Sequence, residues 1–318
     1  MSVAKIILNP YARCWAARER IPEIEQILRA ANTPFELVQT EAPGHGIEVA
    51  AQAVRAGYTP IIAAGGDSTI NEVVNGMMQV WAEWMQTAAP DESPSPESDS
   101  PAQRDLPPLG ILPLGTANDL AADLGLPATL AEALTTIHRG KTRRIDVGQC
   151  NQRYFVNNAG IGMEAYAGYQ QSLMPDSKRS TSRYMQAALK TIVDMPSWEM
   201  DIFWENGRYH GPVSLISVGN GTRTGGMFYL TPEADPFDGS LDFTIGYLKG
   251  RLSAIRHLLM SMRPHNALDK SNQIYTGRGT SLRVISSTPT FLHTDGEIFQ
   301  EQTEMHFRIH PAALPILI

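Results

Sequence analysis

The stretch Ile61-Ile62-Ala63-Ala64-Gly65-Gly66-Asp67-Ser68-Thr69-Ile70-Asn71-Glu72 joins a run of apolar residues to a segment with helical periodicity. Two glycines stand at the point where a buried strand would turn into a helix, and glycine permits positive φ and close approach of the backbone to a ligand. The helix that follows is marked by apolar residues at helical spacing, which predict one buried stripe: Ile70, Val73, Val74, Met77, Met78 and Trp81.

The start of this predicted helix is a candidate phosphate site, because the N–H groups and the dipole of a helix N-terminus attract phosphate oxygens. Thr69 and Glu72 also match a capping box, which would aim those N–H groups outward. The alternative is an ordinary turn between a strand and a helix. The spacing alone does not decide between the two.

Length and composition indicate a folded protein of two domains. The chain has 318 residues, of which 42% are hydrophobic and 19% are charged, as in average soluble domains. A net charge of −7 and the lack of a Lys/Arg block argue against a nucleic-acid partner. Cys14 and Cys150 have no zinc-site spacing and fit a reducing cytoplasm. With no long apolar run, we expect a cytoplasmic protein without a transmembrane segment. A homodimer is left open.

Residues 1–142 alternate between strand and helix patterns and predict an open parallel sheet covered by helices. The expected strands are 5–9, 35–40, 60–64 and 109–114, and the expected helices are 18–31, 47–56, the helix after Asp67, 118–124 and 130–138. Residues 87–108 are crowded with Pro, Ser, Asp and Glu and predict a disordered surface insertion.

Residues 143–309 shift to a period of two and predict a mostly antiparallel β-sandwich domain. The expected strands are 154–158, 200–205, 213–219, 241–247, 290–294 and 303–310, with helices at 181–194 and 252–262. The tail 310–318 is apolar, and we expect it to pack back onto a domain.

A second loop, Leu112-Pro113-Leu114-Gly115-Thr116-Ala117-Asn118-Asp119-Leu120, also ends a strand and opens a helix. Two such loops at neighbouring strand ends would face one crevice, which is where ligands bind in open parallel sheets. Taken alone, Asn118 and Asp119 are each better explained as helix N-caps. The pair of loops together favours a nucleotide site.

The two loops resemble the catalytic domain shared by diacylglycerol kinases, sphingosine kinases and their bacterial relatives. The second motif favours lipid kinases over NAD kinases, which share the first. Further similar segments follow in order along nearly the whole chain outside 87–108: Asn9-Pro10, Thr40, 158–162, 219–221, 225–226, 232–242 and 295–297. The resemblance implies an NAD kinase-like nucleotide-binding domain followed by the β-sandwich domain.

The resemblance also implies site residues. Glu297 is the first choice for the catalytic base and Asp295 is the second. Without the resemblance, Asp295-Gly296 is better explained as a hairpin turn. Asp67 would act next to the magnesium ion that accompanies ATP. The implied ATP-binding residues are Asn9, Pro10, Thr40, Gly65, Gly66, Asp67, Ser68, Thr69, Ile70, Asn71, Thr116, Asn118 and Asp119.

A separate magnesium ion is implied at the turn of residues 235–240, held by the Asp238 carboxylate and the carbonyl groups of Asp235 and Ser240. Hard oxygen ligands of this kind suit magnesium. Asp238-Gly239 is equally well explained as a turn.

The implied activity is transfer of the γ-phosphoryl group of ATP to a lipid hydroxyl, with diacylglycerol as the first candidate and phosphatidic acid as its product. The alternatives are an NAD kinase-like enzyme for a small molecule and a nucleotide-binding regulator without catalysis. Ser68 replaces the glycine usual in the family, and it would be strained if the position required positive φ.

A lipid kinase must reach a membrane surface, so we expect transient peripheral association with the membrane that holds the lipid substrate. Residues 251–263 pattern as an amphipathic helix with three arginines, although such a helix more often packs on a sheet. A second group of basic residues could also either contact a membrane or simply belong to a helix packed on a sheet: Lys178, Arg179, Arg183 and Lys190.

Overall fold

The computed structural model describes residues 3–13, 15–31, 33–87, 105–173, 181–265 and 268–318, and the side chains of residues 181–184 and 300 lie outside the description. Most of the expected insertion at 87–108, together with Lys178 and Arg179, lies outside the described residues. The chain forms two compact units. Unit 1 contains Met1–Leu114, Pro127–Arg144 and Leu314–Ile318, and unit 2 contains Gly115–Leu126 and Ile145–Ala313.

Unit 1 contains a parallel sheet in the order β4-β3-β1-β2. Its strands are β1 (Ala4–Leu8), β2 (Phe35–Gln39), β3 (Ile61–Gly65) and β4 (Leu109–Pro113). Every residue of β1 and β3 is buried, as expected for strands covered on both faces. At the edge of the sheet opposite β2, Ile316 pairs in parallel with Leu109 of β4. The predicted open parallel sheet is confirmed.

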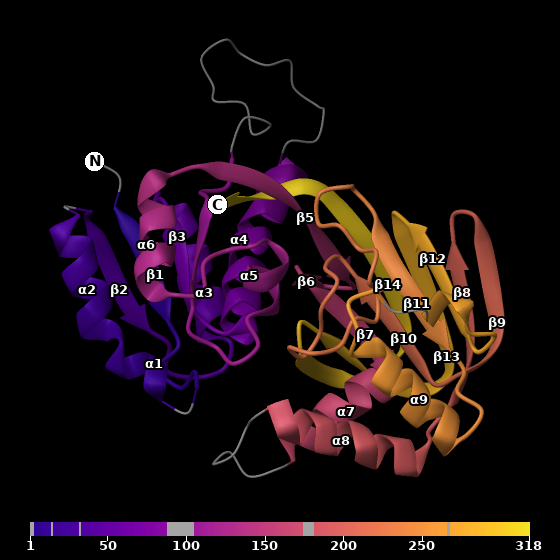
Figure 1. Cartoon of the computed structure of the whole chain (residues 1–318). Coiled ribbons are helices and arrows are strands. Elements are labelled where there is room, and N and C mark those ends of the chain that lie inside the picture. Colours follow the sequence, from indigo (N-terminus) through magenta and orange to yellow (C-terminus); the bar gives the residue numbers. More distant parts are fainter. Residues whose placement is uncertain (1–2, 14, 32, 88–104, 174–180, 266–267) are drawn as a thin grey trace. The chain divides into compact units, whose positions relative to one another are not determined.

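Helices cover the sheet of unit 1 (Figure 1). They are α1 (Ala16–Glu19), α2 (Ile21–Ala30), α3 (His45–Arg55), α4 (Asp67–Thr87) and α6 (Leu130–Arg139). The predicted stripe on α4 faces the core, because Ile70, Val73, Val74, Met77 and Met78 are all buried, whereas Trp81 is half-buried. Ile24 and Leu28 of α2 pack in one cluster with Leu134 and Ile137 of α6.

Unit 2 contains two layers of mostly antiparallel strands. One layer runs β12-β11-β10-β7, and the other includes β9-β8. The long strand β13 serves both layers, because its first part pairs with β8 and its last residues pair with β7 after a register shift between Ile285 and Thr290. The strands are β5 (Thr142–Cys150), β6 (Arg153–Phe155), β7 (Asn158–Gly162), β8 (Trp198–Trp204), β9 (Gly207–Val213), β10 (Leu215–Gly219), β11 (Leu241–Gly246), β12 (Ile274–Gly279), β13 (Ser281–Thr294) and β14 (Glu297–Leu317).

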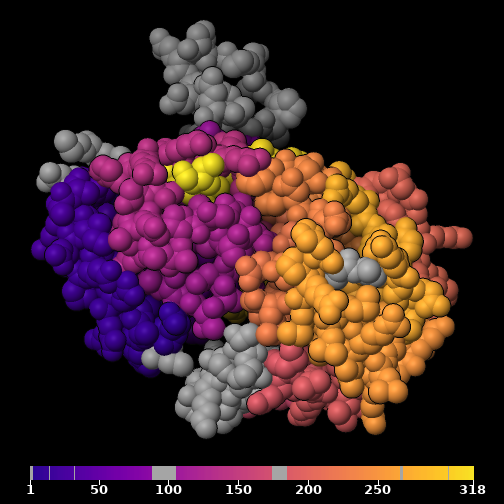
Figure 2. All heavy atoms as spheres, in the orientation of Figure 1, coloured from indigo at the N-terminus to yellow at the C-terminus, as the bar shows by residue number. Residues whose placement is uncertain are grey.

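Apolar side chains from both layers of unit 2 meet in one core that includes Phe155, Ile202, Phe243, Val284 and Phe307. The predicted β-sandwich domain is confirmed. The helices of this unit are α5 (Asp119–Asp123), α7 (Met163–Ser172), α8 (Thr181–Asp194), α9 (Arg251–Ser261) and a short 3-10 helix at Leu268–Lys270. Residues beyond 200, orange to yellow in Figure 2, form much of the surface of unit 2 on the side shown.

The prediction of one strand over 154–158 is wrong. The structure ends β6 at Phe155 and starts β7 at Asn158, because the N–H groups of Val156, Asn157 and Asn158 all donate to the Asp295 carboxylate instead of to a neighbouring strand.

Several elements were not predicted, among them α7, β9 and β12. Their patterns are weak for physical reasons. The buried face of α7 mixes Ala165 and Ala167 with the polar residue Glu164, and β12 is an edge strand that carries Gly277 and Gly279.

One half-buried histidine makes the stability of unit 2 depend on pH. Burial, assisted by the positive charge of Arg308, lowers the pKa of His310 to about 4. An unfolded histidine titrates near pH 6.5, so between about pH 6.5 and 4 the unfolded chain binds more protons than the folded one. The free energy of unfolding therefore falls as the pH is lowered through this range.

We expect His310→Gln to lose less stability than the wild type between pH 7 and pH 5, measured as the shift of the urea midpoint. The matched control is His265→Gln, because His265 is exposed. Equal shifts in the wild type and His310→Gln would contradict the assignment.

Candidate active site

The carboxyl ends of four parallel strands meet in unit 1. The N–H group of Thr40 donates to Leu8 O (2.8 Å), and that of Asn9 donates to Ala64 O (3.0 Å). Leu114 N donates to Gly65 O (2.9 Å), which joins the ends of β3 and β4. The structure thus brings together Asn9, Pro10, Thr40 and residues 65–71, which the sequence predicts as parts of one site.

Gly65 is required by close packing and not by its backbone angle. A Cβ atom at this position would lie 2.2 Å from Thr69 Oγ1. Neither Gly65 nor Gly66 has a positive φ. Thr69 is buried, and its hydroxyl oxygen has no hydrogen-bond partner among the described residues.

Ser68 is not strained. It is the second residue of α4 and it is exposed, with a backbone outside the positive-φ region. The conformational objection to a serine at this position therefore does not apply.

The predicted capping box at Thr69 and Glu72 is wrong. The helix begins at Asp67, so Thr69 lies inside its first turn. The Glu72 carboxylate instead accepts hydrogen bonds from Gly44 N (2.7 Å) and Gly46 N (2.9 Å) at the start of α3. A negative charge at that position stabilises the N-terminus of α3 and ties α3 to α4.

The other predicted residues of unit 1 make local contacts or pack in the core. Asn9 Oδ1 accepts from Tyr11 N (3.0 Å), and Pro10 is buried. Asn71 is buried, and both its backbone oxygen and its Oδ1 accept from Asn75 Nδ2 (2.9 and 3.1 Å). Ile70 faces the core, whereas Asp67 is half-buried at the start of α4.

Thr116, Asn118 and Asp119 belong to unit 2. Asn118 occupies the N-cap position of α5, but its side chain does not cap the helix; it bonds instead with Gly115 N (3.0 Å) and Gly115 O (3.2 Å). Asp119 is buried, and both carboxylate oxygens lie 3.1 Å from Gly226 N. The N-cap interpretation of these two side chains is therefore wrong. Asp119 instead accepts a hydrogen bond from the turn at Gly225-Gly226. The side chain of Thr116 is exposed.

Asp123 was missed in the sequence, although it lies four residues after Asp119 and therefore on the same face of α5. Its carboxylate accepts from Thr222 N (2.7 Å), Thr222 Oγ1 (2.9 Å) and Arg223 N (3.3 Å). Arg223 in turn donates to Gly226 O (2.9 Å). Two acids of α5 therefore hold the 222–226 loop.

Asp295 and Gly296 form a two-residue hairpin turn between β13 and β14, with φ values of 46° and 85°. The prediction of a turn is confirmed. The Asp295 carboxylate is buried and accepts from Val156 N (2.9 Å), Asn157 N (2.9 Å) and Asn158 N (3.0 Å). Glu297 follows directly as the first residue of β14 and is half-buried.

The turn at residues 235–240 is held by backbone bonds and by an arginine. Asp238 Oδ1 accepts from Ser240 N (2.9 Å), and Asp235 Oδ1 accepts from Phe237 N (3.1 Å). Asp238 Oδ2 lies 3.0 Å from a guanidinium nitrogen of Arg278. Asp146, which the sequence did not single out, accepts from Gly239 N (2.6 Å) and Ala312 N (2.6 Å).

Arg278 interacts with several oxygen atoms at this turn. It also donates to Asp242 and to Glu233 O (3.0 Å). Burial raises the pKa of Asp242, and the hydrogen bond from Arg278 opposes that rise. Arg278 thus places a guanidinium group beside the carboxylates of Asp238 and Asp242.

Comparisons with known proteins agree over both parts of the chain. Residues 3–150 match the diacylglycerol kinase catalytic domain, and residues 158–318 match the YegS C-terminal NAD kinase beta sandwich-like domain. A diacylglycerol kinase of Bacillus subtilis (strain 168) is 30% identical over 301 residues, which cover 93% of this chain and 90% of the relative. One of Staphylococcus saprophyticus is 28% identical over 294 residues, covering 92% and 88%.

A solved structure of a diacylglycerol kinase from Bacillus anthracis str. Sterne has the same fold, with a TM-score of 0.70 at 22% identity over 99% of this chain and 96% of that one. The two domain matches occur in order and together span nearly the whole chain. The chain therefore belongs to the bacterial diacylglycerol kinase family of lipid kinases.

Proposed function

We propose that this protein is an ATP-dependent lipid kinase that transfers the γ-phosphoryl group to a lipid hydroxyl, with diacylglycerol as an acceptor and phosphatidic acid as the product of that reaction. The observation that carries the proposal is the convergence of four parallel strand ends on the N-terminus of α4 in unit 1. Crevices at such strand ends are the sites where open α/β sheets bind nucleotides.

Unit 1 would bind the phosphates of ATP at the start of α4, where the N–H groups and the helix dipole favour negative charge. Asp67 is the acidic residue of the first turn and offers the type of oxygen that magnesium prefers. It would hold the magnesium ion that accompanies ATP, an ion that supplies charge neutralisation on the transferred group. Thr116, Asn118 and Asp119 remain predicted nucleotide contacts.

Glu297 is better suited than Asp295 to act as the base. Both oxygens of Asp295 already accept backbone N–H groups, so its role is to position the hairpin. Glu297 would accept the proton of the lipid hydroxyl as its oxygen bonds to the γ-phosphorus and the bond to the bridging oxygen of ADP breaks.

Arg278 would supply the positive charge at the 235–240 turn for which the resemblance implies magnesium. Its guanidinium group reaches Asp238 and Asp242 together. On this proposal, the turn needs no metal ion to fold.

Peripheral contact with a membrane would occur through α8 and α9, which lie at the surface of unit 2 (Figures 1 and 2). Among the described residues, no helix is long and apolar enough to cross a membrane. Leu252 and Leu259 of α9 are 85% and 58% exposed, and Val193 of α8 is 56% exposed. Arg251 joins the two helices by donating to Val193 O (2.9 Å). Such an apolar surface beside cationic residues is typical of interfacial helices.

The function is tested with labelled ATP and magnesium against diacylglycerol, phosphatidylglycerol, sphingosine, ceramide and NAD. We expect label in diacylglycerol, and we expect Asp67→Asn and Glu297→Gln to lower turnover by about 10²–10⁴-fold with unchanged thermal denaturation. Glu301→Gln, an exposed residue on the same strand as Glu297, is the control.

Label in NAD alone would establish the small-molecule kinase instead. Binding of ATP without any labelled product would support the regulator.

Arg278→Met should lower the free energy of unfolding by about 1–3 kcal/mol, because it leaves Asp238 and Asp242 without their charged donor. A chelator added to the ATP-free wild type should leave its denaturation temperature unchanged. Arg208→Met, an exposed arginine on β9, is the control. The assignment would be wrong if the chelator destabilised the wild type while Arg278→Met did not.

Leu252→Glu combined with Leu259→Glu should reduce the fraction of protein that sediments with vesicles of phosphatidylcholine and phosphatidylglycerol. Activity on water-soluble dioctanoylglycerol should stay at the wild-type level, since these side chains point away from the protein. Met85→Glu changes an exposed apolar residue on a helix of unit 1 and serves as the control. Unchanged sedimentation of the double variant would exclude this surface.

A further inference from the structure

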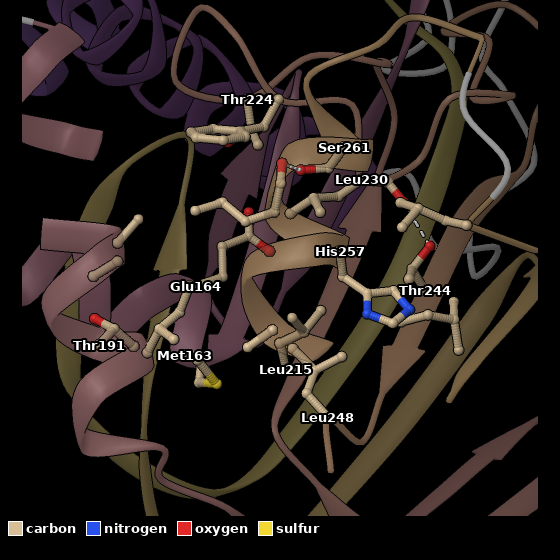
Figure 3. Close-up of a pocket in the computed structure, with 18 residues that line it drawn as sticks. Met163, Glu164, Thr191, Leu215, Thr224, Leu230, Thr244, Leu248, His257 and Ser261 are labelled. Atoms are coloured by element: carbon tan, nitrogen blue, oxygen red, sulfur yellow. Dashed lines mark hydrogen bonds between the residues drawn. The ribbon is translucent and has the colours of Figure 1, made fainter. Parts of the chain in front are cut away.

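An apolar cavity lies within unit 2 (Figure 3). A mostly apolar wall with a few polar groups is usual for small-molecule sites. Helices α7, α8 and α9 supply Met163, Ile192 and Leu258 to its wall, and the strands supply Leu215 and Ile274. The same helix α9 exposes Leu252 and Leu259, so an apolar surface and an apolar cavity lie on two sides of one helix.

Most polar side chains in the wall already bond to the protein. Thr191 Oγ1 donates to Ala187 O (3.0 Å), Thr244 Oγ1 to Leu230 O (2.6 Å) and Ser261 Oγ to Leu258 O (2.8 Å). The ring nitrogens of His257 lie 2.8 Å from Ser253 O and 2.7 Å from Ser271 Oγ. These polar groups therefore already have partners within unit 2.

Glu164 differs from them. Its side chain is 2% exposed, and its carboxyl group points into the middle of the cavity-lining residues in Figure 3. Oε1 accepts from Asn158 Nδ2 (2.7 Å) and lies 3.3 Å from His293 Nε2. Oε2 is buried and has no hydrogen-bond partner among the described residues. A buried carboxylate oxygen without a donor is costly, so this atom is suited to a ligand that brings one.

The partners of Glu164 connect it to the hairpin that carries the proposed base. Asn158 N donates to Asp295 Oδ1 (3.0 Å), and Gly296 N donates to His293 Nδ1 (3.3 Å). Each of the two partners of Glu164 thus also contacts the Asp295-Gly296 turn. A ligand group bound to Oε2 would therefore lie close to that turn.

The donor that Oε2 lacks cannot be the hydroxyl that reacts. That hydroxyl has one proton, and the proposed function assigns it to Glu297. Diacylglycerol has a single hydroxyl and would leave Oε2 unpaired, whereas a monoacylglycerol brings a second one.

We propose that the cavity holds the apolar chain of the acceptor lipid and that Glu164 Oε2 accepts a hydrogen bond from a second hydroxyl, so that monoacylglycerols are better acceptors than diacylglycerols. This inference rests on the proposed lipid kinase function and assigns the acceptor class of the same site. Glu164 is a specificity-determining residue and not the base.

The test compares 1-octanoylglycerol with 1,2-dioctanoylglycerol on the full chain, by calorimetric binding without ATP and by kcat/KM with ATP. One unpaired buried acceptor is worth about 1–3 kcal/mol, so we expect wild-type kcat/KM to favour 1-octanoylglycerol by about fivefold to 150-fold. Glu164→Gln keeps the volume and the bond to Asn158 but replaces Oε2 by an N–H donor. In that variant the preference should fall to about one.

The control is Glu199→Gln, an exposed glutamate of the same unit. Ala188→Phe fills the cavity from α8 and should weaken binding of both lipids without changing the affinity for ATP. Thermal denaturation verifies that each variant is folded, and either variant alone can decide the result.

The cavity proposal is wrong if the wild type shows no preference, if Glu164→Gln keeps the wild-type preference, or if folded Ala188→Phe binds both lipids normally. In each case phosphorylation of diacylglycerol would leave the kinase function standing. Binding of 1-octanoylglycerol that Glu164→Gln weakens, without phosphorylation of any lipid, would instead support the cavity and reject the kinase.

Discussion

The capture of three consecutive backbone N–H groups by one buried carboxylate, that of Asp295, organises the functional part of unit 2. These donors come from the peptide between β6 and β7, which would otherwise continue as a strand. The bonds fix the hairpin that presents Glu297, and they place Asn158 where its side chain can hold Glu164. Three buried N–H groups without this acceptor would each carry a desolvation cost.

The candidate site of unit 1 is positioned mainly by backbone hydrogen bonds. Backbone bonds between Thr40 and Leu8, between Asn9 and Ala64, and between Leu114 and Gly65 align the strand ends without any side chain. The packing of Thr69 against Gly65 then fixes the entry into α4. The candidate phosphate site is therefore a product of sheet geometry, whereas the acidic hairpin of unit 2 is a product of one side chain. Loss of a single side chain threatens the second more than the first.

Local patterns in the sequence predicted what local forces decide. The apolar stripe of α4 and the Asp-Gly hairpin depend on neighbours within a few residues, and both predictions are confirmed. The family and the order of its motifs were also readable, because the motif segments are short and contiguous. The two-layer architecture followed from the change of hydrophobic period near residue 143.

Partners of polar side chains could not be predicted, because tertiary contacts choose them. Glu72 binds the start of α3, Asp119 binds Gly226, and Arg278 binds Asp238, each across a long stretch of sequence. Glu164 carried no signal, since an acid in a weakly patterned helix looks like a surface residue. The sequence also suggested strain at Ser68 that the structure does not have, because Ser68 lies inside α4.

The course of β14 has a consequence for how this chain can be divided. Its first residue belongs to the acidic hairpin of unit 2, and its last residues pair with β4 in unit 1. Unit 1 is assembled from three separate stretches of the chain, the last of which is Leu314–Ile318. A fragment that stops after the first matched domain would therefore expose an edge of β4 that Ile316 pairs with in this structure. The two matched domains share strand β14 and are not interchangeable modules.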